Sequence, residues 1–288
     1  MTAKASWSCS YCLDQCKPVE VNNLNKMPQK AKLGQNFLVD RGARSRIVEA
    51  LGDISVKTVV EIGPGKAAIT ELLAGKAGRL IAVELDRELA PKLAERFAGP
   101  QVEVIERDIL TVDLASLRQG DEKLLVVGNL PYYITSDILL HLFHHHEAIS
   151  RAVVMMQREV ADRVAAAPGS RDYGLLSATT QLYARVEKLM TLPPGAFSPP
   201  PQVYSSVLRL TFAPRFEELS VDHEDFIAFL RLCFAQKRKT LLNNLRAAGF
   251  EASKIAEVTE ASAVSPQARA EALSLETMAA LYRAIKMA

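Results

Sequence analysis

Short apolar runs alternate with segments of helical spacing through the first two-thirds of the chain. The runs are TVVEI (58–62), LIAVEL (80–85), VEVIE (102–106), LLVV (124–127) and AVVMM (152–156). Between them, apolar residues recur at helical spacing over 69–76, 87–98, 136–146 and 158–166. Because most of the runs are continuously apolar, both faces of each strand are expected to be buried. The pattern predicts an α/β fold in which helices cover both faces of a parallel sheet.

The pattern changes after residue 200. The run SSVLRLTF (205–212) alternates apolar and polar residues, which predicts an edge strand. Pro214 then interrupts the chain, and helical spacing follows over 222–234, 239–248, 268–273 and 275–287. We therefore expect a Rossmann-like domain over 27–212 and a small all-helical domain over 213–288. Residues 1–26 hold few apolar partners, so we expect them to form a disordered extension.

Composition and charge narrow the class of protein. Hydrophobic residues make up 49% and charged residues 24% of the chain, as in ordinary globular proteins. No apolar run reaches the roughly 18 residues that a membrane helix needs, and the N-terminus lacks the apolar core of a secretory signal. We therefore expect a cytoplasmic protein without a membrane partner. The net charge of +2 implies that affinity for nucleic acid must come from local basic patches.

The cysteines and histidines favour no metal site. Cys9, Cys12 and Cys16 are one ligand short of a closed zinc site, and Cys233 is the single thiol of the main body. This usage argues against a disulfide framework and for a reducing cytosol. For the cysteine segment, the alternatives are a zinc site completed from elsewhere and a translation start at Met27. A further group of histidines fans around one predicted helix end, which favours an exposed surface; these are His141, His144, His145 and His146.

A glycine-rich turn follows the first strand. Gly63 and Gly65 stand between a predicted strand and a predicted helix, where glycine lets a ligand approach the backbone closely. Glu84 ends the next strand about 20 residues on, a spacing at which a carboxylate accepts hydrogen bonds from ribose hydroxyls. Pro64 removes an N–H that a pyrophosphate would use, and Asp108 follows the third strand, where it can accept from an adenine amino group. These features favour S-adenosylmethionine over NAD, although Asp108 alone also fits a helix cap.

The fourth strand ends in Asn129-Leu130-Pro131-Tyr132, a combination suited to chemistry on a planar exocyclic amine. Adenine N6 is a poor nucleophile because its lone pair is delocalised into the ring. An asparagine amide oxygen and a carbonyl of a rigid X-Pro turn can each accept an N6 proton, which directs the lone pair toward a methyl donor. Tyr132 offers a flat face on which an extruded base can stack. The alternative is a proline-terminated strand whose aromatic residues cap the core.

An ordered series of motifs runs along the chain from residue 27 onward. The motifs are GQNFLVD (34–40), EIGPG (61–65), VELD (83–86), RDIL (107–110), GNLPYYIT (128–135) and GAFSPPPQVYSSVLRL (195–210). With them the chain closely resembles the ribosomal RNA adenine N6-dimethyltransferases, the group linked to kasugamycin sensitivity. The resemblance implies a class I S-adenosylmethionine-dependent methyltransferase fold with a small helical C-terminal domain. It also implies dimethylation of two adjacent adenines near the 3′ end of small-subunit ribosomal RNA.

The resemblance further implies roles for single residues. It places contacts to S-adenosylmethionine at Asn36, Leu38, Gly63, Glu84, Asp108 and Asn129. It makes Asn129 to Tyr132 the catalytic loop, with Phe197 as the second aromatic residue around the target base. On physical grounds alone, Phe197 would more often be a core residue. The chain departs from the family at Ala67, where a third glycine is usual, and this slightly weakens the cofactor assignment.

Basic residues in the helical segment are candidate phosphate contacts. Lys237, Arg238 and Lys239 are consecutive, and Arg246 follows them. Such runs are usually solvated faces, but beside an RNA-modifying site they are suited to grip the RNA backbone. We therefore expect the helical domain to bind RNA, and the protein to act as a monomer on ribosomal RNA within an assembling small ribosomal subunit.

Other functions remain open on the same motifs. They are a large-subunit ribosomal RNA adenine methyltransferase of antibiotic-resistance type, a DNA adenine methyltransferase, and a non-catalytic ribosome assembly factor. The tandem tyrosines of NLPYYIT and the stretch QKRKTLLNNL favour the small-subunit enzymes. A DNA enzyme would more often carry a second proline in place of Leu130. The intact catalytic loop beside a complete set of cofactor acids argues against lost catalysis.

Overall fold

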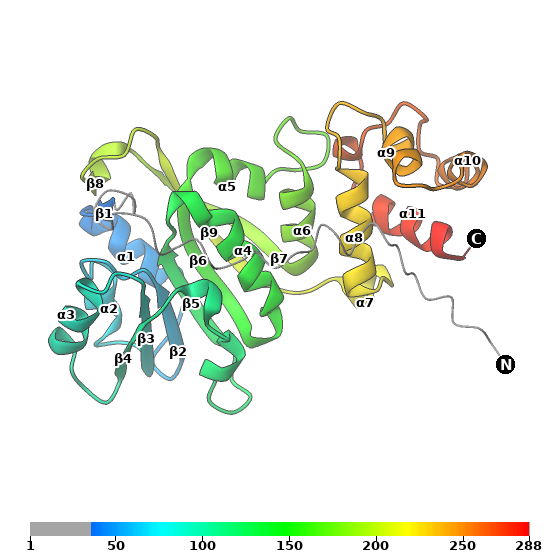
Figure 1. Ribbon diagram of the computed structural model, residues 1–288. Helices are drawn as coiled ribbons and strands as arrows, with labels where there is room; N and C mark the ends of the chain where they lie inside the picture. Colours follow the sequence, from blue (N-terminus) through cyan, green and yellow to red (C-terminus); the bar gives the residue numbers. More distant parts are fainter. Residues whose placement is uncertain (1–35, 288) are drawn as a thin grey trace. The chain divides into compact units, whose positions relative to one another are not determined.

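A seven-stranded sheet lies at the centre of the fold (Figure 1). The computed structural model describes residues 36–287, so the extension predicted over 1–26 and its cysteines lie outside the described residues. In spatial order the strands are β4 (Val102–Glu106), β3 (Arg79–Glu84), β2 (Thr58–Ile62), β5 (Leu124–Asn129), β6 (Ile149–Gln157), β9 (Ser205–Phe212) and β7 (Ala184–Leu192). Strands β4 to β6 are parallel, whereas β9 is antiparallel to both β6 and β7. The predicted α/β fold is confirmed.

The strand predicted at the edge lies inside the sheet. Because β9 sits between β6 and β7, the prediction of an edge position is wrong. Its polar residues Ser205 and Ser206 are fully buried, and their hydroxyls bond to Tyr132 and Thr191. Alternation in the sequence therefore does not mark a solvated face here. The edge strand on this side of the sheet is β7, whose charged, exposed residues conceal the apolar pattern that identifies the other strands.

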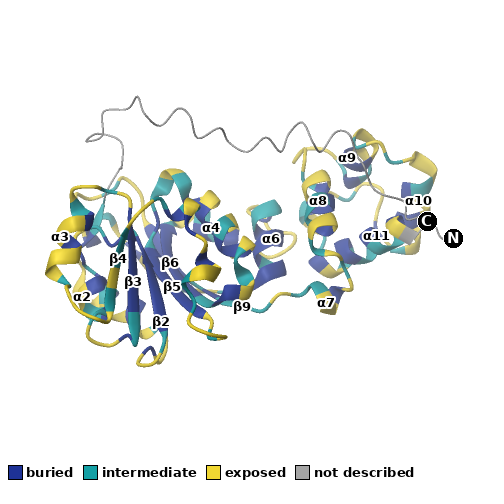
Figure 2. Cartoon of the chain, turned by 60° about the horizontal axis from the view of Figure 1, so that its bottom comes forward, coloured by how far each residue is buried: buried dark blue, intermediate teal, exposed yellow. Residues whose placement is uncertain are grey.

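Each strand sends side chains into two hydrophobic cores, one on each face of the sheet. Val60 and Val126 belong to one core, and their neighbours Val59 and Val127 belong to the other. The first core includes α4 (Thr135–His144), α5 (Arg158–Val164) and α6 (Leu175–Tyr183), and the second includes α1 (Arg41–Glu49) and α2 (Thr70–Leu73). Another helix, α3 (Leu89–Arg96), packs beside β4. Successive strand residues point to opposite faces, so a continuously apolar strand is buried on both (Figure 2).

Helices make up the chain beyond β9. They are α7 (Phe216–Leu219), α8 (His223–Cys233), α9 (Leu241–Ala247), α10 (Ala252–Ala261) and α11 (Leu275–Met287). Both α8 and α11 contact α6, and their apolar side chains continue the core on that face of the sheet. Arg215 pairs with Glu218 and with Glu276, which ties the start of this helical segment to its last helix.

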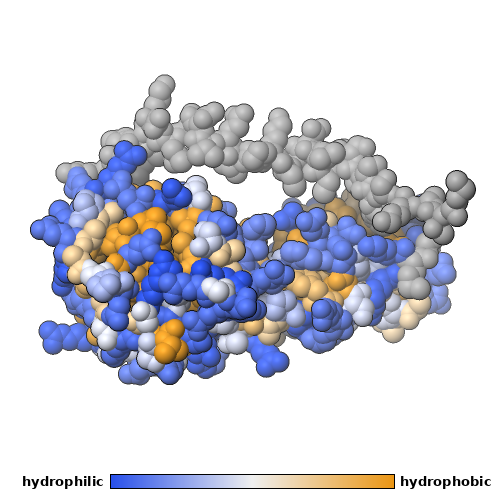
Figure 3. Space-filling view, turned by 90° about the horizontal axis from the view of Figure 1, so that it is seen from below, coloured by the Kyte–Doolittle hydropathy of each residue, from blue (hydrophilic) through white to orange (hydrophobic). Residues whose placement is uncertain are grey.

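The surface of the molecule is mixed in character. On the face shown in Figure 3, hydrophilic side chains surround separate areas of apolar ones. Within residues 36–287, no helix combines the length and the apolar character that a membrane span requires.

A second, two-stranded sheet brings distant parts of the chain to the strand ends. Strand β1 (Phe37–Leu38) pairs antiparallel with β8 (Phe197–Ser198). The N–H groups of Val39 and Asp40 donate to the Ala196 carbonyl at 2.8 and 3.2 Å. The guanidinium of Arg44 on α1 donates to the Leu38 carbonyl. Residues 37–40 are thereby joined to the loop that precedes β9.

Candidate active site

The glycine turn after β2 presents its backbone to open space. Gly63 and Gly65 have φ angles of +63° and +57°, a left-handed region in which glycine is favoured. A β-carbon on Gly63 would meet no heavy atom within 4 Å, so a ligand can approach there. At Gly65 a β-carbon would lie 2.9 Å from the Phe37 ring, over which the Lys66 ammonium also lies. Among residues 36–287, the turn is thus open at its first glycine and packed against Phe37 at its second.

Glu84 fixes this turn from the end of β3. One carboxylate oxygen accepts the Gly65 N–H and the other accepts the Asp86 N–H, both at 2.9 Å. The residue is buried, and each oxygen keeps a second lone pair beyond these bonds. Glu84 therefore joins the glycine turn after β2 to the turn after β3. Its remaining lone pairs can still accept hydrogen bonds from hydroxyl groups of a ligand.

Asp108 caps the short helical turn after β4 while one of its oxygens stays available. Its Oδ1 accepts the Leu110 N–H at 3.0 Å, so the helix-cap interpretation describes part of its role. The neighbouring Tyr133 is 56% exposed. Partial burial raises the pKa of Tyr133, and the charges of Asp108 and Glu84 raise it further. The sequence analysis assigned no role to Tyr133, although the tandem tyrosines were a signal for it.

Glu61, inside β2, was also missed by the sequence analysis. Its side chain is 2% exposed, and Oε2 has no hydrogen-bond partner among residues 36–287. Burial raises the pKa of Glu61 to about 7; nearby Thr70 opposes this rise and the charge of Glu84 adds to it. In the sequence, Glu61 could have been noticed as an acidic residue within an otherwise apolar strand, two residues before Gly63.

Asn129 stands at the end of β5 in a fixed orientation. Its Nδ2 donates to the Asn36 carbonyl at 2.9 Å, across a separation of 93 residues in the chain. Its Oδ1 is buried and has no hydrogen-bond partner in the described part of the chain. A buried amide oxygen without a donor is costly, and such orphans in native structures call for an explanation. The arrangement leaves one oriented acceptor ready for a donor from a ligand.

The next two residues of the loop shape a second acceptor. Leu130 is buried, and its N–H donates to the Met155 carbonyl at 2.9 Å, which anchors the loop to β6. The Pro131 carbonyl already accepts the Thr135 hydroxyl at 2.9 Å and the Ile134 N–H at 3.2 Å. The carbonyl of Leu130, at the X-Pro bond, is therefore the better candidate for a second acceptor beside Asn129.

The two aromatic residues assigned to the target base differ in environment. Tyr132 is half-buried, and its hydroxyl bonds to Ser205 Oγ at 2.9 Å. Phe197 is only 3% exposed and packs with Leu38, its partner across β1 and β8. Leu38 is buried as well, so its side chain belongs to the core. Phe197 is thus a core residue in this structure, and its ring is not accessible to a base.

The basic residues assigned to RNA lie on the surface of the helical segment. Lys237, Arg238 and Lys239 are all exposed in the connection between α8 and α9, and Arg246 is exposed on the last turn of α9. Lys237 donates to the Arg171 carbonyl at 3.2 Å. Asn244, which follows this run, is instead buried and ties α9 to the Cys233 carbonyl at 2.7 Å.

Histidines in the last turns of α4 and directly after it make main-chain contacts. Burial lowers the pKa of His141, whose Nε2 bonds to the Val112 carbonyl at 3.0 Å. His145 and His146 bond through Nδ1 to the carbonyls of His141 and Phe143. Over the described range of the chain, no group of three or more His, Cys, Asp or Glu side chains is arranged to hold a metal ion.

One family and several known proteins are similar to the chain. Residues 27–286 match the family described as ribosomal RNA adenine dimethylase. A ribosomal RNA small subunit methyltransferase A of Acidobacterium capsulatum is 67% identical over 258 residues, covering 89% of this chain and 91% of the relative. A solved dimethyladenosine transferase from Plasmodium falciparum has a TM-score of 0.74 at 24% identity, covering 85% of this chain and 95% of its own. The solved 23S rRNA methyltransferase ErmE has a TM-score of 0.67 at 25% identity, covering 87% of this chain and 100% of its own.

Proposed function

Because the chain belongs to the ribosomal RNA adenine dimethylase family, we propose that it dimethylates N6 of two adjacent adenines near the 3′ end of small-subunit ribosomal RNA. The methyl donor is S-adenosylmethionine, as in the related methyltransferases. The observation that carries the proposal is the Asn129 side chain, whose Nδ2 is held by Asn36 while its Oδ1 is buried without a donor from residues 36–287.

The catalytic loop is suited to activate an exocyclic amine. Asn129 Oδ1 would accept one N6 proton, and the Leu130 carbonyl would accept the other. Both acceptors are held by the protein before any base arrives, since Asn129 is tied to Asn36 and Leu130 to Met155. Pre-oriented acceptors cost no reorganisation during the reaction. The lone pair of N6 is then directed out of the ring plane, and no general base is needed in advance, because the proton leaves after the methyl group has arrived.

The strand ends offer a site that fits the cofactor. When bound, S-adenosylmethionine supplies an electrophilic methyl group on a positively charged sulfur. Gly63 offers an open approach to the backbone, Glu84 retains acceptor lone pairs for ribose hydroxyls, and Asp108 retains one oxygen for an adenine amino group. Asn36 and Leu38 would border the same site from β1, Asn36 through its contact with Asn129. Carboxyl ends of parallel strands are where open α/β sheets bind ligands.

The small subunit is the favoured substrate over the large subunit. The relative named for the small subunit shares 67% of its residues with this chain, and the one named for 23S rRNA shares 25%. The target base must leave its stack to reach Asn129, so a folded context that presents it is favoured over a plain duplex. The proposed setting is a cytoplasmic monomer acting on an assembling small subunit, with residues 213–288 as the domain that docks on RNA.

A transfer assay on both subunits tests this proposal. Labelled S-adenosylmethionine is offered to small and large ribosomal subunits that lack these modifications, and the modified bases are then mapped. We expect label in the small subunit, as dimethyladenine at two adjacent positions. Equal rates on the large subunit would refute the small-subunit assignment.

Variants of the catalytic loop test the chemistry separately from docking. Asn129→Ala removes the oriented acceptor and should lower kcat by about 100-fold or more. Tyr132→Ala should lose most methylation because stacking on the base is lost, while affinity for S-adenosylmethionine stays near that of the wild type. Tyr132→Phe keeps the ring and loses only the bond to Ser205, so it serves as the matched control. Full activity in Asn129→Ala would remove the observation on which the proposal rests.

A further inference from the structure

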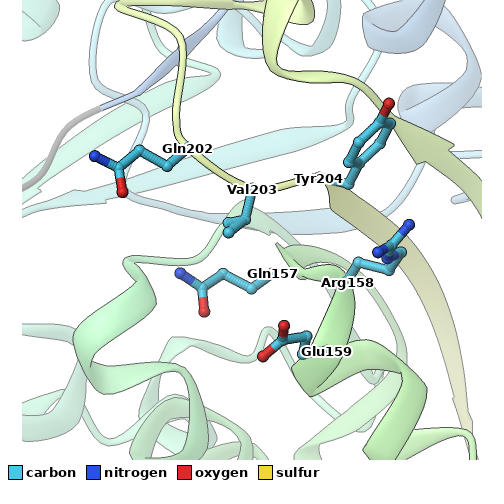
Figure 4. Close-up of a pocket in the computed structure, with 6 residues that line it drawn as sticks. All are labelled: Gln157, Arg158, Glu159, Gln202, Val203 and Tyr204. Carbon is cyan, nitrogen blue, oxygen red and sulfur yellow. The ribbon is translucent and has the colours of Figure 1, made fainter.

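A small pocket lies beside the catalytic loop, outside every residue assigned so far. It has a volume of about 160 Å³. One wall is formed by the end of β6 and the start of α5, and the other by the loop before β9. The lining residues are Gln157, Arg158, Glu159, Gln202, Val203 and Tyr204. In Figure 4 the two glutamine side chains extend to one side, and Arg158 and Tyr204 lie together on the other.

The pocket is linked to the catalytic loop through Gln157 on β6. Gln157 pairs across the sheet with Ser205, whose hydroxyl bonds to Tyr132. Gln157 also lies two residues beyond Met155, the β6 partner of Asn129. From ideal strand spacing, the Cα of Gln157, at the wall of the pocket, lies roughly 5 Å to the side of the Asn129 Cα and roughly 7 Å further along the strand direction. This offset exceeds the roughly 3.4 Å rise of stacked nucleotides and suits a neighbour that has left the stack.

The chemistry of the lining is that of a base site. Glutamine amides pair with the edges of bases, particularly adenine, through one donor and one acceptor. The Arg158 guanidinium lies 5.1 Å from the centre of the Tyr204 ring, and that tyrosine is 46% exposed. Exposed aromatic rings and guanidinium planes are the platforms on which proteins stack unpaired bases.

The charges of the pocket argue for a base and against a phosphate. Arg158 brings one positive charge and Glu159 one negative charge, so the lining attracts phosphate weakly. The Glu159 carboxylate is instead suited to accept hydrogen bonds from an exocyclic amine. The Arg158 main-chain N–H is already bonded to the Tyr204 carbonyl at 2.9 Å, which holds both walls of the pocket together without any ligand.

We propose that this pocket binds the base of a nucleotide directly next to the adenine being methylated, so that the enzyme holds two neighbouring bases at once. The inference rests on the proposed function and adds a second base site to it. Such a site holds the RNA strand in register on the catalytic loop, and it contributes to recognition of the substrate more than to the chemical step.

Variants at the two walls separate recognition from chemistry. Tyr204→Ala and Arg158→Ala should each raise KM for the unmodified small subunit by about tenfold, because a stacking platform is lost, and should change kcat little. Tyr204→Phe keeps the ring and should restore KM to near the wild-type value. Gln101→Ala, at another exposed glutamine, is the control that should change nothing. Affinity for S-adenosylmethionine and the temperature of unfolding, measured on the same variants, should stay near the wild-type values.

A double-mutant cycle identifies the base in the pocket. Small subunits are reconstituted with unmodified RNA in which the base flanking the mapped adenine is removed to leave an abasic position, one flank at a time, because another base could still stack. With the wild-type enzyme, loss of the base on one flank should lower kcat/KM about tenfold. With Tyr204→Ala, whose kcat/KM is already reduced, loss of the same base should lower kcat/KM little further. If the effects of Tyr204→Ala and of the lost base on kcat/KM simply multiply, whichever flank is altered, the two do not interact and the inference is overturned. An unchanged KM in Tyr204→Ala would overturn it as well. If the wild-type enzyme does not methylate unmodified small subunits, the proposed function itself fails. Normal methylation with unaffected pocket variants overturns the second base site alone.

Discussion

At the scale of single residues, the site is built from main-chain polar groups held by buried side chains. Glu84 bonds two N–H groups of consecutive turns, and Asn129 bonds the carbonyl of Asn36. These bonds fix each side chain and leave further acceptor capacity, on both Glu84 oxygens and on Asn129 Oδ1. Charged and amide groups at strand ends therefore serve structure and binding together, so substitutions there should affect both stability and cofactor affinity.

Ala67 shows why the family prefers glycine at the third position of the turn. It adopts a φ of +69° and is fully buried, with its N–H bonded to the Pro64 carbonyl at 2.9 Å. We expect Ala67→Gly to change the free energy of unfolding by less than about 1 kcal/mol, because relief of the left-handed strain and loss of a buried methyl nearly cancel. Ala67→Val should be strongly destabilising, since a branched residue is an outlier at positive φ. Urea unfolding of both variants checks this, and wild-type stability in Ala67→Val would contradict it.

Glu61 predicts a pH dependence of stability. Its pKa is raised from 4.5 to about 7 in the folded protein, so the folded state holds the proton more tightly than the unfolded state. Between these values stability from this group falls as the pH rises, and the full cost is present above pH 7. Glu61→Gln should therefore gain stability over the wild type, by on the order of 2 kcal/mol more at pH 8 than at pH 5. Urea unfolding at both pH values measures the gain; the same difference at each pH would show that Glu61 does not titrate in this range.

At the scale of elements, the catalytic loop depends on how closely β2 and β5 approach. Gly128 immediately precedes Asn129, and a β-carbon on it would lie 2.8 Å from the Ile62 carbonyl oxygen. Strand β5 must therefore carry glycine at this point to keep its place in the sheet. Asn129 reaches its position because the residue before it, Gly128, has no side chain.

Gly128→Ala should accordingly displace the strand end and the loop with it. We expect at least tenfold loss of methylation together with a lower temperature of unfolding, because backbone cannot yield as a flexible side chain can. Gly75→Ala is the matched control, since its β-carbon would meet nothing within 4 Å and should leave both properties unchanged. Normal methylation by Gly128→Ala would show that the loop does not depend on this approach.

At the scale of the whole molecule, the helical segment is packed on the sheet domain through shared side chains. Its apolar residues continue the core beneath α6, and Tyr183 at the end of α6 bonds to His223 at the start of α8. The exposed basic residues Lys237, Arg238, Lys239 and Arg246 lie on this helical segment, whereas the catalytic loop lies on the sheet. Recognition of RNA backbone and methyl transfer are thus expected to be carried by different parts of the chain.

This separation predicts that docking can be weakened without affecting the chemistry. Lys237, Arg238 and Lys239 changed together to Ala should weaken binding to small subunits and flatten its dependence on salt, because fewer counterions are released. Binding measured between about 50 and 200 mM salt tests this. Lys76→Ala with Lys92→Ala, at two exposed lysines of the sheet domain, is the control. A salt dependence equal to that of the wild type would remove the basic residues from the interface.

The sequence by itself determined the parts of the fold that depend on local chemistry. The bounds of β2, β4 and β9 agree with the predicted runs, because apolar periodicity and flanking Gly and Pro act over a few residues. The glycine turn and the loop from Asn129 to Tyr132 were likewise visible, since their chemistry is carried by adjacent residues. Helices α1, α6, α7 and α10 and the edge strand β7 were missed, and the helix expected over 268–273 is only a short turn at Ala270–Ala272. In α10 and β7, charged residues interrupt the apolar pattern.

Only the tertiary structure decided which distant residues meet. It placed β9 inside the sheet, buried Phe197 against Leu38, and oriented Asn129 through a carbonyl 93 residues away. It also joined residues 157–159 to residues 202–204 in one pocket. Contacts of this kind depend on strand order and packing, which pair segments far apart in the chain, so no local pattern of residues could have indicated them.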